Sequence, residues 1–335
     1  MLSFTLRRLA LAVPTLLLIA AVIFLLLDAA PGDPMADQPL TIPPEVREQM
    51  RRALGLGEPL HVRFGLWLYQ FFVVEPLVLV DHLFGTAYAE GRARIISWQF
   101  KSPVMTVIVE RLPQTLWVAG LGYLVGVLIA LPIGIVSATR QYSWFDQVGT
   151  FVSMVGSSVP TFFTGVLLIV VFSVELGWFP SIYDTQLEVT DWPSFLQQVR
   201  QMALPVFVLA LFNASQVSRY MRASMLDNLQ QDYVRTARAK GMGERTVVLR
   251  HVLRNSMIPV VTVIALGVPT VFGGAIITEQ VFKVNGLGQL LITAINANDL
   301  PMVQMLTFMF AVLIVLFNLV ADVLYGLLDP RIRYD

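Results

Sequence analysis

The side chains that most often perform chemistry in proteins are few in this sequence, and their spacing does not suit a reactive site. There is no cysteine, which excludes disulfides, thiolate metal ligands and thiol nucleophiles. The three histidines, His61, His82 and His251, lie far apart and form no HExxH-like pair, so we expect no metal site. Neither a GxSxG serine motif nor a GxxxxGK[ST] phosphate-binding loop is present in the sequence. We therefore expect no catalytic residue, and any ATP would have to be bound by another subunit.

Ionisable residues are also scarce in the apolar stretches that could cross a membrane. A transporter driven by an ion gradient carries such residues within its spans, because it binds the coupling ion there. Here Asp322 is the exception, and we interpret it as the partner of a nearby arginine rather than as a proton relay. A secondary transporter or channel stays the first alternative. A membrane-embedded enzyme would lack a visible nucleophile, and a structural anchor would not explain the basic loop described below.

The composition indicates a membrane protein. Of the 335 residues, 56% are hydrophobic and 14% are charged, whereas soluble domains have roughly 45–50% and 25%. The mean hydropathy is +0.68. A soluble core cannot hide this much apolar surface, so lipid must be part of the solvent. The formal net charge is zero, which gives no indication of a nucleic-acid partner.

The lengths of the apolar stretches predict about six transmembrane helices, because a helix needs about 20 apolar residues to cross the bilayer. Five stretches are uncharged over 19 to 27 residues, and a sixth, Ala203–Val217, is shorter: the five are Leu9–Leu27, Thr115–Val136, Val148–Val174, Met257–Thr278 and Val303–Ala321. We therefore predict an all-α membrane protein.

The distribution of charge predicts the orientation of these helices, because basic loops stay in the cytoplasm. Arg7 and Arg8 precede the first span, the segment after the fourth is rich in arginine, and the loop after the third is mostly acidic. Both termini are therefore expected in the cytoplasm, with an even number of spans. A cleaved signal peptide over residues 1–30 is the competing interpretation. It would leave an odd number of spans.

Three further features concern packing. Residues 28–105 form a long loop on the outer side, with a short helix over Glu45–Leu54 and another around His61–Val73, and we expect this loop to fold as a cap. Small residues recur four apart and predict close helix packing, with a pore lining as the alternative: Gly122 and Gly126, then Gly149, Ser153 and Ser157. Prolines within spans predict kinks, at Pro132, Pro160 and Pro269.

The basic segment Asp232–Pro259 is the most informative part of the chain. Asp232 can cap a helix with an apolar face that includes Val234 and Ala237. Gly241 is placed where this helix should end, and Glu244 lies near the start of a second helix. We predict two short helices joined at a glycine on the inner membrane surface. They could dock into a cleft of a cytoplasmic partner, or rest as a basic amphipathic helix on anionic lipid.

This segment resembles the EAA loop of type I ATP-binding-cassette (ABC) importer permeases, whose pattern is E-A-A-x(3)-G-x(9)-I-x-L-P. Aligned on Gly241, only Ala237, Gly241 and Leu253 keep the general pattern. The sequence R-T-A-R-A-K-G followed by H-x-L-R-N instead is similar to the dipeptide, oligopeptide and nickel branch. Further motifs of that branch occur in order along nearly the whole chain, namely Ala30–Pro34, Glu110–Pro113 with Thr115, Thr278–Glu279, Val281–Phe282, Gly286–Gly288 and Asp329–Arg333.

The resemblance implies a type I ABC importer fold in a bacterial inner membrane. Its first part, residues 1–102, would hold the first helix and a long periplasmic cap loop, extended over residues 73–102. Residues 103–328 would form the five-helix core with a coupling loop at 232–254, and residues 329–335 a cytoplasmic tail. The chain would resemble the first permease subunit of a heterodimer that moves peptides or a similar small solute.

The resemblance also implies partners and site residues. A second permease, two ATPase subunits that bind ATP and Mg²⁺, and a periplasmic solute-binding protein would complete the importer within membrane lipid. Eight residues would couple the chain to the ATPases: Arg235, Thr236, Ala237, Lys240, Gly241, Glu244, His251 and Arg254. Four residues of the last outer loop would face the binding protein: Glu279, Phe282, Gly286 and Gly288.

Overall fold

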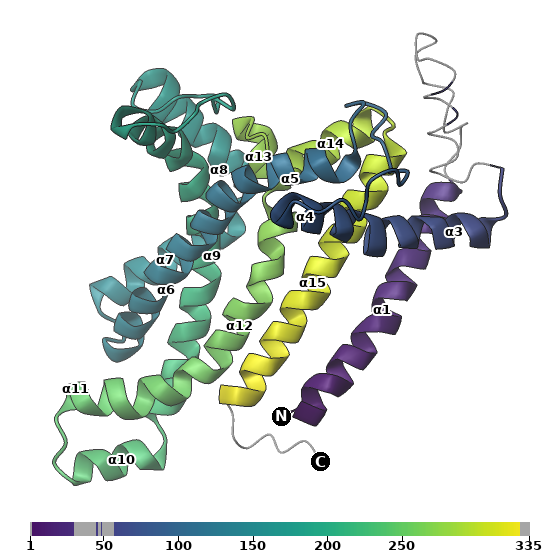
Figure 1. Ribbon diagram of the computed structural model, residues 1–335. Helices are drawn as coiled ribbons and strands as arrows, with labels where there is room; N and C mark the ends of the chain where they lie inside the picture. The colour runs from purple at the N-terminus through teal and green to yellow at the C-terminus, as the bar shows by residue number, and fades with distance from the viewer. Residues whose placement is uncertain (1, 30–44, 46–47, 49–56, 329–335) are drawn as a thin grey trace. The chain divides into compact units, whose positions relative to one another are not determined.

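The computed structural model describes residues 2–29, 45, 48 and 57–328, and these residues are helical apart from loops, turns and one isolated β-bridge (Figure 1). The predicted helix over Glu45–Leu54 lies almost entirely outside the described residues. The helices, in chain order, are α1 (Leu2–Asp28), α3 (Leu60–Tyr69), η1 (Gln70–Val74), α4 (Glu75–Phe84), α5 (Val104–Thr115), η2 (Leu116–Gly120), α6 (Leu121–Thr139), α7 (Trp144–Ser158), α8 (Thr161–Leu168), η3 (Ile169–Glu175), α9 (Trp192–Leu229), α10 (Asp232–Ala239), α11 (Glu244–Thr246), η4 (Val247–Val252), α12 (Leu253–Gly274), α13 (Ile276–Phe282), α14 (Leu287–Asn296) and α15 (Leu300–Leu328). The all-α prediction is confirmed.

The chain forms two compact units. The first contains Met1–Ala10, Pro113–Gln289 and Leu313–Asp335, and the second contains Leu11–Leu112 and Leu290–Val312. Each unit is described separately below.

Six helical segments of the described chain are long and apolar enough to cross a membrane, and a seventh candidate is a bent pair. The six are Thr5–Asp28, Leu60–Asp81, Val104–Thr139, Trp192–Leu229, Glu244–Pro269 and Leu300–Leu324. Four of them contain predicted spans, and Glu244–Pro269 overlaps the predicted span Met257–Thr278 in part. The sixth, Leu60–Asp81, falls in the predicted outer loop.

The stretch Val148–Val174, predicted as one span, is broken. The helices α7 and α8–η3 meet at an angle of 104°. Pro160 has no N–H for the helix ladder and disfavours helical backbone in the residue before it. Accordingly, Val159 is extended, with φ −83° and ψ 126°. The predicted kink at Pro160 is thus a complete break, while Pro132 and Pro269 lie inside continuous helices.

In the first unit, α6 and α9 pack closely along their lengths. A Cβ atom on Gly122 would lie 2.7 Å from Cβ of Leu209, and one on Gly126 would lie 2.9 Å from the carbonyl oxygen of Ala210. Only glycine allows this approach. The predicted packing role of Gly122 and Gly126 is confirmed within the chain itself.

The helix α9 is 38 residues long, or about 57 Å at 1.5 Å per residue, so the short apolar stretch Ala203–Val217 is only its middle. A capping box fixes its start. The Asp191 carboxylate accepts from the Ser194 backbone N–H at 2.9 Å, and the Ser194 hydroxyl oxygen accepts from the Asp191 N–H at 3.0 Å.

In the second unit, an aromatic cluster joins three helices. The ring of Trp67 in α3 lies 6.1 Å from Phe24 of α1 and 4.9 Å from Phe308 of α15, and Phe71 of η1 lies 4.6 Å from Phe308. Asp299, just before α15, is fully buried. Its carboxylate accepts from the Ser97 hydroxyl and from the backbone N–H groups of Trp98, Gln99 and Met302. The segment after α4 is thereby tied to the start of α15.

Asp322 behaves as predicted. Its carboxylate lies 3.0 Å from the guanidinium of Arg8, and both residues belong to the first unit. The pair joins the two ends of the chain's helical part and confirms the interpretation of Asp322 as the partner of an arginine.

Candidate functional site

The helix α10 ends at the glycine that the sequence indicated. Gly241 has φ +75°, in the left-handed region that favours glycine. Its N–H donates to the carbonyl of Arg238 at 3.0 Å, and the Met242 N–H donates to the carbonyl of Ala237 at 3.3 Å. These two bonds form a complete Schellman motif. The prediction that Asp232 caps the helix is wrong: the cap is Gln231, which makes no side-chain cap bond, and Asp232 is the first helical residue.

The second helix differs from the prediction in its length. It begins at Glu244 as expected, but α11, η4 and α12 follow one another without a break to Gly274. A candidate span, Glu244–Pro269, lies within it. The glycine turn is therefore joined by continuous helix to a segment long and apolar enough to cross a membrane.

The apolar face of α10 is used inside the chain. Val234 is 0% exposed and Ala237 5% exposed, and they pack in one cluster with Val247 and Val252 of η4. The helix α10 is therefore held against the start of the following helix by buried apolar contact.

The predicted coupling residues are mostly exposed side chains on this framework. Ala237 is buried and His251 is half-buried, whereas the other six are exposed: Arg235, Thr236, Lys240, Gly241, Glu244 and Arg254. The buried Nε2 of His251 has no hydrogen-bond partner within the described part of the chain.

An ion pair that sequence reasoning missed closes the turn. The Arg238 guanidinium donates from Nη2 to Oε1 of Glu244 at 2.6 Å and from Nε to Oε2 at 3.0 Å. Arg238 belongs to the basic segment Asp232–Pro259, but its partner lies beyond the Gly241 turn and is not at helical spacing.

A second polar cluster lies where α5, α13 and α14 meet, within the first unit. Glu279 is 0% exposed. Its Oε1 accepts from the Thr115 hydroxyl at 2.8 Å, and its Oε2 accepts from the N–H groups of Gly288 at 2.8 Å and Gln289 at 3.0 Å. The Thr115 hydroxyl oxygen in turn accepts from the Leu287 N–H at 2.8 Å. One carboxyl group thus ties three elements together.

The same cluster explains two glycines. A Cβ on Gly286 would lie 2.5 Å from the Thr115 hydroxyl, and one on Gly288 would lie 2.5 Å from Cα of Ile276. Burial raises the pKa of the Glu279 carboxyl above its ordinary value, although the three hydrogen bonds that it accepts lower it.

The four residues expected to face a binding protein are all buried. Glu279, Phe282, Gly286 and Gly288 all belong to the cluster or pack directly beside it. Of the loop between α13 and α14, only Lys283 is exposed. The four residues therefore shape this loop from inside, and any surface it presents is made by neighbours such as Lys283.

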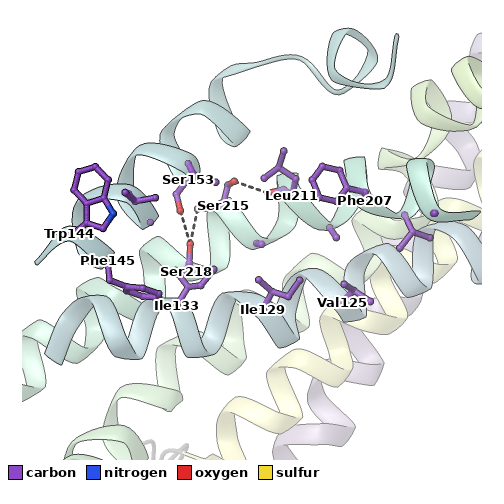
Figure 2. Close-up of a pocket in the computed structure, with 17 residues that line it drawn as sticks. Val125, Ile129, Ile133, Trp144, Phe145, Ser153, Phe207, Leu211, Ser215 and Ser218 are labelled. Carbon is purple, nitrogen blue, oxygen red and sulfur yellow. Dashed lines mark hydrogen bonds between the residues drawn. The ribbon is translucent and has the colours of Figure 1, made fainter. Parts of the chain in front are cut away.

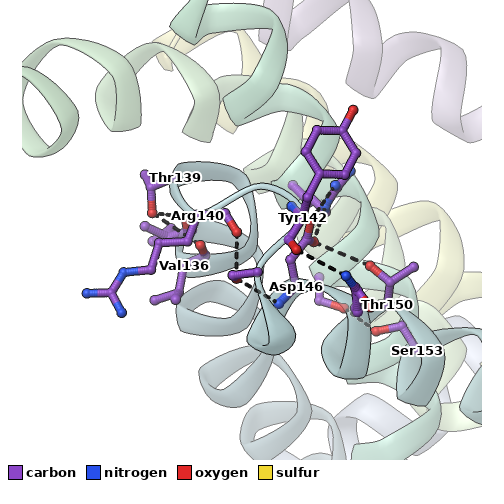
Figure 3. A network of polar contacts seen from close by, with 12 residues as sticks. Val136, Thr139, Arg140, Tyr142, Asp146, Thr150 and Ser153 are labelled. Atoms are coloured by element: carbon purple, nitrogen blue, oxygen red, sulfur yellow. Dashed lines mark hydrogen bonds and ion pairs between the residues drawn. The ribbon is translucent and has the colours of Figure 1, made fainter.

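An ion pair links α7 to α9 at the Asp146 carboxylate, which belongs to the polar network drawn in Figure 3. The Arg222 guanidinium donates from Nε to Oδ1 of Asp146 at 2.7 Å and from Nη2 to Oδ2 at 2.9 Å. Asp146 Oδ2 also accepts from the Tyr142 N–H at 3.0 Å, so the pair fixes the turn between α6 and α7.

An apolar groove of about 580 Å³ lies between α6, α7 and α9 (Figure 2). Its walls carry no charged side chain among the described residues, and its polar groups are mainly the hydroxyls of Ser153, Ser215 and Ser218. The hydroxyls of Ser153 and Ser218 lie 3.0 Å apart. Ser153 thus serves contact between α7 and α9, as its small size predicts.

Among the described residues, no three His, Cys, Asp or Glu side chains gather as metal ligands would. The cluster around Glu279, the Asp146–Arg222 pair and the Gly241 turn hold helices in position. Their residues show no nucleophile beside a base.

Comparison with solved structures identifies the fold. A chain of the inward-facing MetNI methionine ABC transporter aligns with a TM-score of 0.53 at 19% identity, covering 67% of this chain and 97% of that chain. The type I ABC importer fold predicted from the sequence is thereby confirmed. At this identity the likeness concerns the fold alone.

Curated relatives match over their full lengths. The oligopeptide transport system permease protein AppB of Bacillus subtilis is 37% identical over 342 residues, and the glutathione transport system permease protein GsiC of Salmonella choleraesuis is 38% identical over 338 residues; each match covers 100% of both chains. The profile of an N-terminal family, "Binding-prot-dependent transport system membrane comp, N-term", matches residues 1–119. A second profile, "Binding-protein-dependent transport system inner membrane component", matches residues 130–334. The chain therefore belongs to the family of binding-protein-dependent transport system inner membrane components, as permeases of ABC importers do.

Proposed function

We propose that this chain is the non-catalytic translocation subunit of an ABC importer for peptides. The pair of helices α10 and α11 would contact an ATPase subunit and receive its motion. Relatives named for oligopeptide and glutathione transport, both peptides, support this class of substrate. ATP and Mg²⁺ would be bound by the partner ATPases, since the sequence has no phosphate-binding loop.

The observation that carries the proposal is that the apolar face of α10 is buried within the chain. Its apolar residues Val234 and Ala237 are buried against the start of the next helix, so they are not free to enter lipid. This favours docking to a protein over resting on the membrane surface. The outward side of α10 and its C-cap carries basic side chains. They include Arg235, which is 76% exposed, and Lys240, which is also exposed. After the Gly241 turn, the continuous helix made of α11, η4 and α12 leads to the candidate span Glu244–Pro269.

The charge distribution supports a cytoplasmic position for α10 and both termini in a bacterial cell. The complete importer would contain a second, homologous permease, two ATPase subunits and a periplasmic solute-binding protein. The loop between α13 and α14 would lie on the opposite, periplasmic side.

Site-directed cross-linking tests this proposal, because the chain has no cysteine of its own. A single cysteine at Arg235 or Lys240 should cross-link to the ATPase subunit in native membranes, and ATP should change the yield. A cysteine at Arg92, in the second unit, is the matched control and should give no ATPase product. Absence of cross-links from both α10 positions would refute the docking role.

Reconstitution distinguishes the alternative. Peptide uptake into liposomes should require the ATPases, ATP and the binding protein together. Uptake by the chain alone on an ion gradient would support a secondary transporter instead.

A further inference from the structure

The segment Leu60–Phe84 is one continuous helix, made of α3, η1 and α4. By length and composition, most of it qualifies as a membrane span. Its contacts within the second unit indicate a different arrangement.

The helix crosses α1 and α15 instead of running along them. Phe64 and Trp67 both meet α1 at Phe24, and Trp67, Phe71 and Phe72 all meet α15 at the single residue Phe308. A helix aligned with α15 would meet successive turns of it. Figure 1 accordingly draws α3 and α4 across these two helices.

The crossing points lie close to one end of each of these two candidate spans. Phe24 is four residues from Asp28 at the end of α1, and Phe308 is eight residues from Leu300 at the start of α15; at 1.5 Å per residue these are about 6 and 12 Å. Helices that lie in the plane of a membrane bury their apolar face by about 5–10 Å at the boundary of headgroups and acyl chains.

Three polar side chains of this helix bind the segment that follows it. Glu75 pairs with Arg94 at 2.6 Å, Gln70 donates to the carbonyl of Ala93 at 2.7 Å, and Asp81 accepts from the backbone N–H of Ala89 at 2.7 Å. The segment 86–94 therefore covers the polar face.

A different face is exposed and apolar. We call it the apolar stripe, and it consists of Tyr69, Phe72, Val73, Leu79 and Phe84, each between 37% and 75% exposed. At its edge, the Tyr69 hydroxyl accepts from Arg92 at 2.5 Å, an aromatic ring with a polar tip as found at membrane interfaces. Near the contact with Phe24, α1 also exposes the apolar side chains of Val22, Leu25 and Leu26.

We infer that Leu60–Phe84 is a helix lying in the membrane plane, and that its apolar stripe binds the acyl-chain region of the outer leaflet. The choice of leaflet rests on the orientation proposed above. Three observations support the in-plane position and the contact with lipid. They are the crossing of α1 and α15, the contacts of the polar residues with segment 86–94, and the exposed apolar side chains of α1 nearby. Lipid would thus hold the cap segment at a fixed height beside the bundle.

Labelling from the two sides of the membrane tests the in-plane arrangement. Single cysteines at His61 and Glu90 lie before and after most of the helix, and a membrane-impermeant maleimide added outside intact spheroplasts should modify both. Arg235→Cys is the control that should react only after permeabilisation. Labelling of one site from each side would overturn the in-plane arrangement. Labelling of both only from inside would overturn the outer leaflet and the proposed orientation together.

Spin labels test the occupant of the stripe. In the complete complex in lipid nanodiscs, labels at Val73 and at Leu79 should be accessible to oxygen and at least several-fold less accessible to a water-soluble nickel chelate. Leu26→Cys is the lipid reference, Glu90→Cys the water reference and Phe71→Cys the buried reference. Low accessibility to both reagents would mean a protein partner, such as a second permease, and high nickel accessibility would mean water; either overturns the inference. The two labelled positions lie more than one helical turn apart, so one reports if the other prevents assembly.

Discussion

Arg238 and Glu244 face each other across the Gly241 turn, joined by two hydrogen bonds of 2.6 and 3.0 Å. The side chains are 44% and 61% exposed, so the pair contributes only about 0–1 kcal/mol to stability. Its effect is geometric: a bidentate pair fixes the angle between α10 and the helix that leads into the bundle.

Charge reversal tests this geometric role. Arg238→Glu or Glu244→Arg alone places like charges across the turn, and we expect peptide transport per ATP hydrolysed to fall several-fold with little change in the unfolding temperature. The double reversal restores an opposite pair and should recover most of the coupling. Equal losses in the single and double variants would show that the pair has no bracing role.

Gly241→Val should uncouple transport while the protein stays in the membrane. A β-branched residue at φ +75° costs about 1–2 kcal/mol, although a Cβ there would meet no atom within 4 Å. The loss would thus come from backbone conformation alone. Gly243→Val is the matched control, because Gly243 has equal space and an extended backbone with φ −62°. ATP-dependent uptake and the amount of membrane-inserted protein are measured for both; normal uptake by Gly241→Val would contradict the proposed lever.

The features that could be predicted from the sequence depend on residues close together in the chain. The Gly241 turn, the packing of Gly122 and Gly126, and the role of Asp322 each follow from spacing or from the end of a helix. At Pro160 the sequence predicts only a kink, because an uncharged stretch of 27 residues favours one continuous span over a break at a single proline.

Contacts between distant residues were beyond such reasoning. Thr115 and Glu279 are 164 positions apart, and Asp146 and Arg222 are 76 apart, so no periodicity joins them. The helix Leu60–Phe84 shows the same limit. Its hydropathy is compatible with a span, and only the contacts of its aromatic rings with Phe24 and Phe308 indicate how it lies.

Alanine at Gly286 or Gly288 should loosen the cluster around Glu279. The added methyl group would overlap Thr115 and Glu279 in the first case and the backbone of Ile276 in the second, and overpacking of this kind costs about 1–3 kcal/mol. Gly120→Ala is the control, since a Cβ there meets no atom within 4 Å. Thermal unfolding in detergent should show lower midpoints for the first two variants only. Wild-type midpoints for both would mean that α13 and α14 can shift freely.

Glu279→Gln should change how stability depends on pH. Burial raises the pKa of the Glu279 carboxyl from an ordinary 4.5, so the folded protein holds this proton more tightly than the unfolded chain. The contribution to stability is then fully present below about pH 4.5 and is lost as pH rises through the raised value. We expect the unfolding temperature of the parent to fall relative to that of Glu279→Gln over this window. Glu188→Gln, an exposed site, should show no such trend. A constant difference at all pH values would argue against a raised pKa.

Asp146 and Arg222 should show strong coupling in a double-mutant cycle. Asp146 is 4% exposed and its partner 31% exposed, so Asp146→Leu leaves a half-buried cation without its counter-charge, and we expect a loss of about 1–3 kcal/mol. The double variant Asp146→Leu with Arg222→Met removes both charges and should recover a large part of this loss. The exposed pair of Asp232 and Arg235, 3.4 Å apart, is the matched control, and Asp232→Asn should change stability by less than about 0.5 kcal/mol. Denaturation is measured for the purified wild type, for Asp146→Leu and Arg222→Met singly and together, and for Asp232→Asn as the control. Additive losses at Asp146 and Arg222 would mean that each acts through other contacts, and the turn between α6 and α7 would then owe its position to Ser143 and the backbone alone.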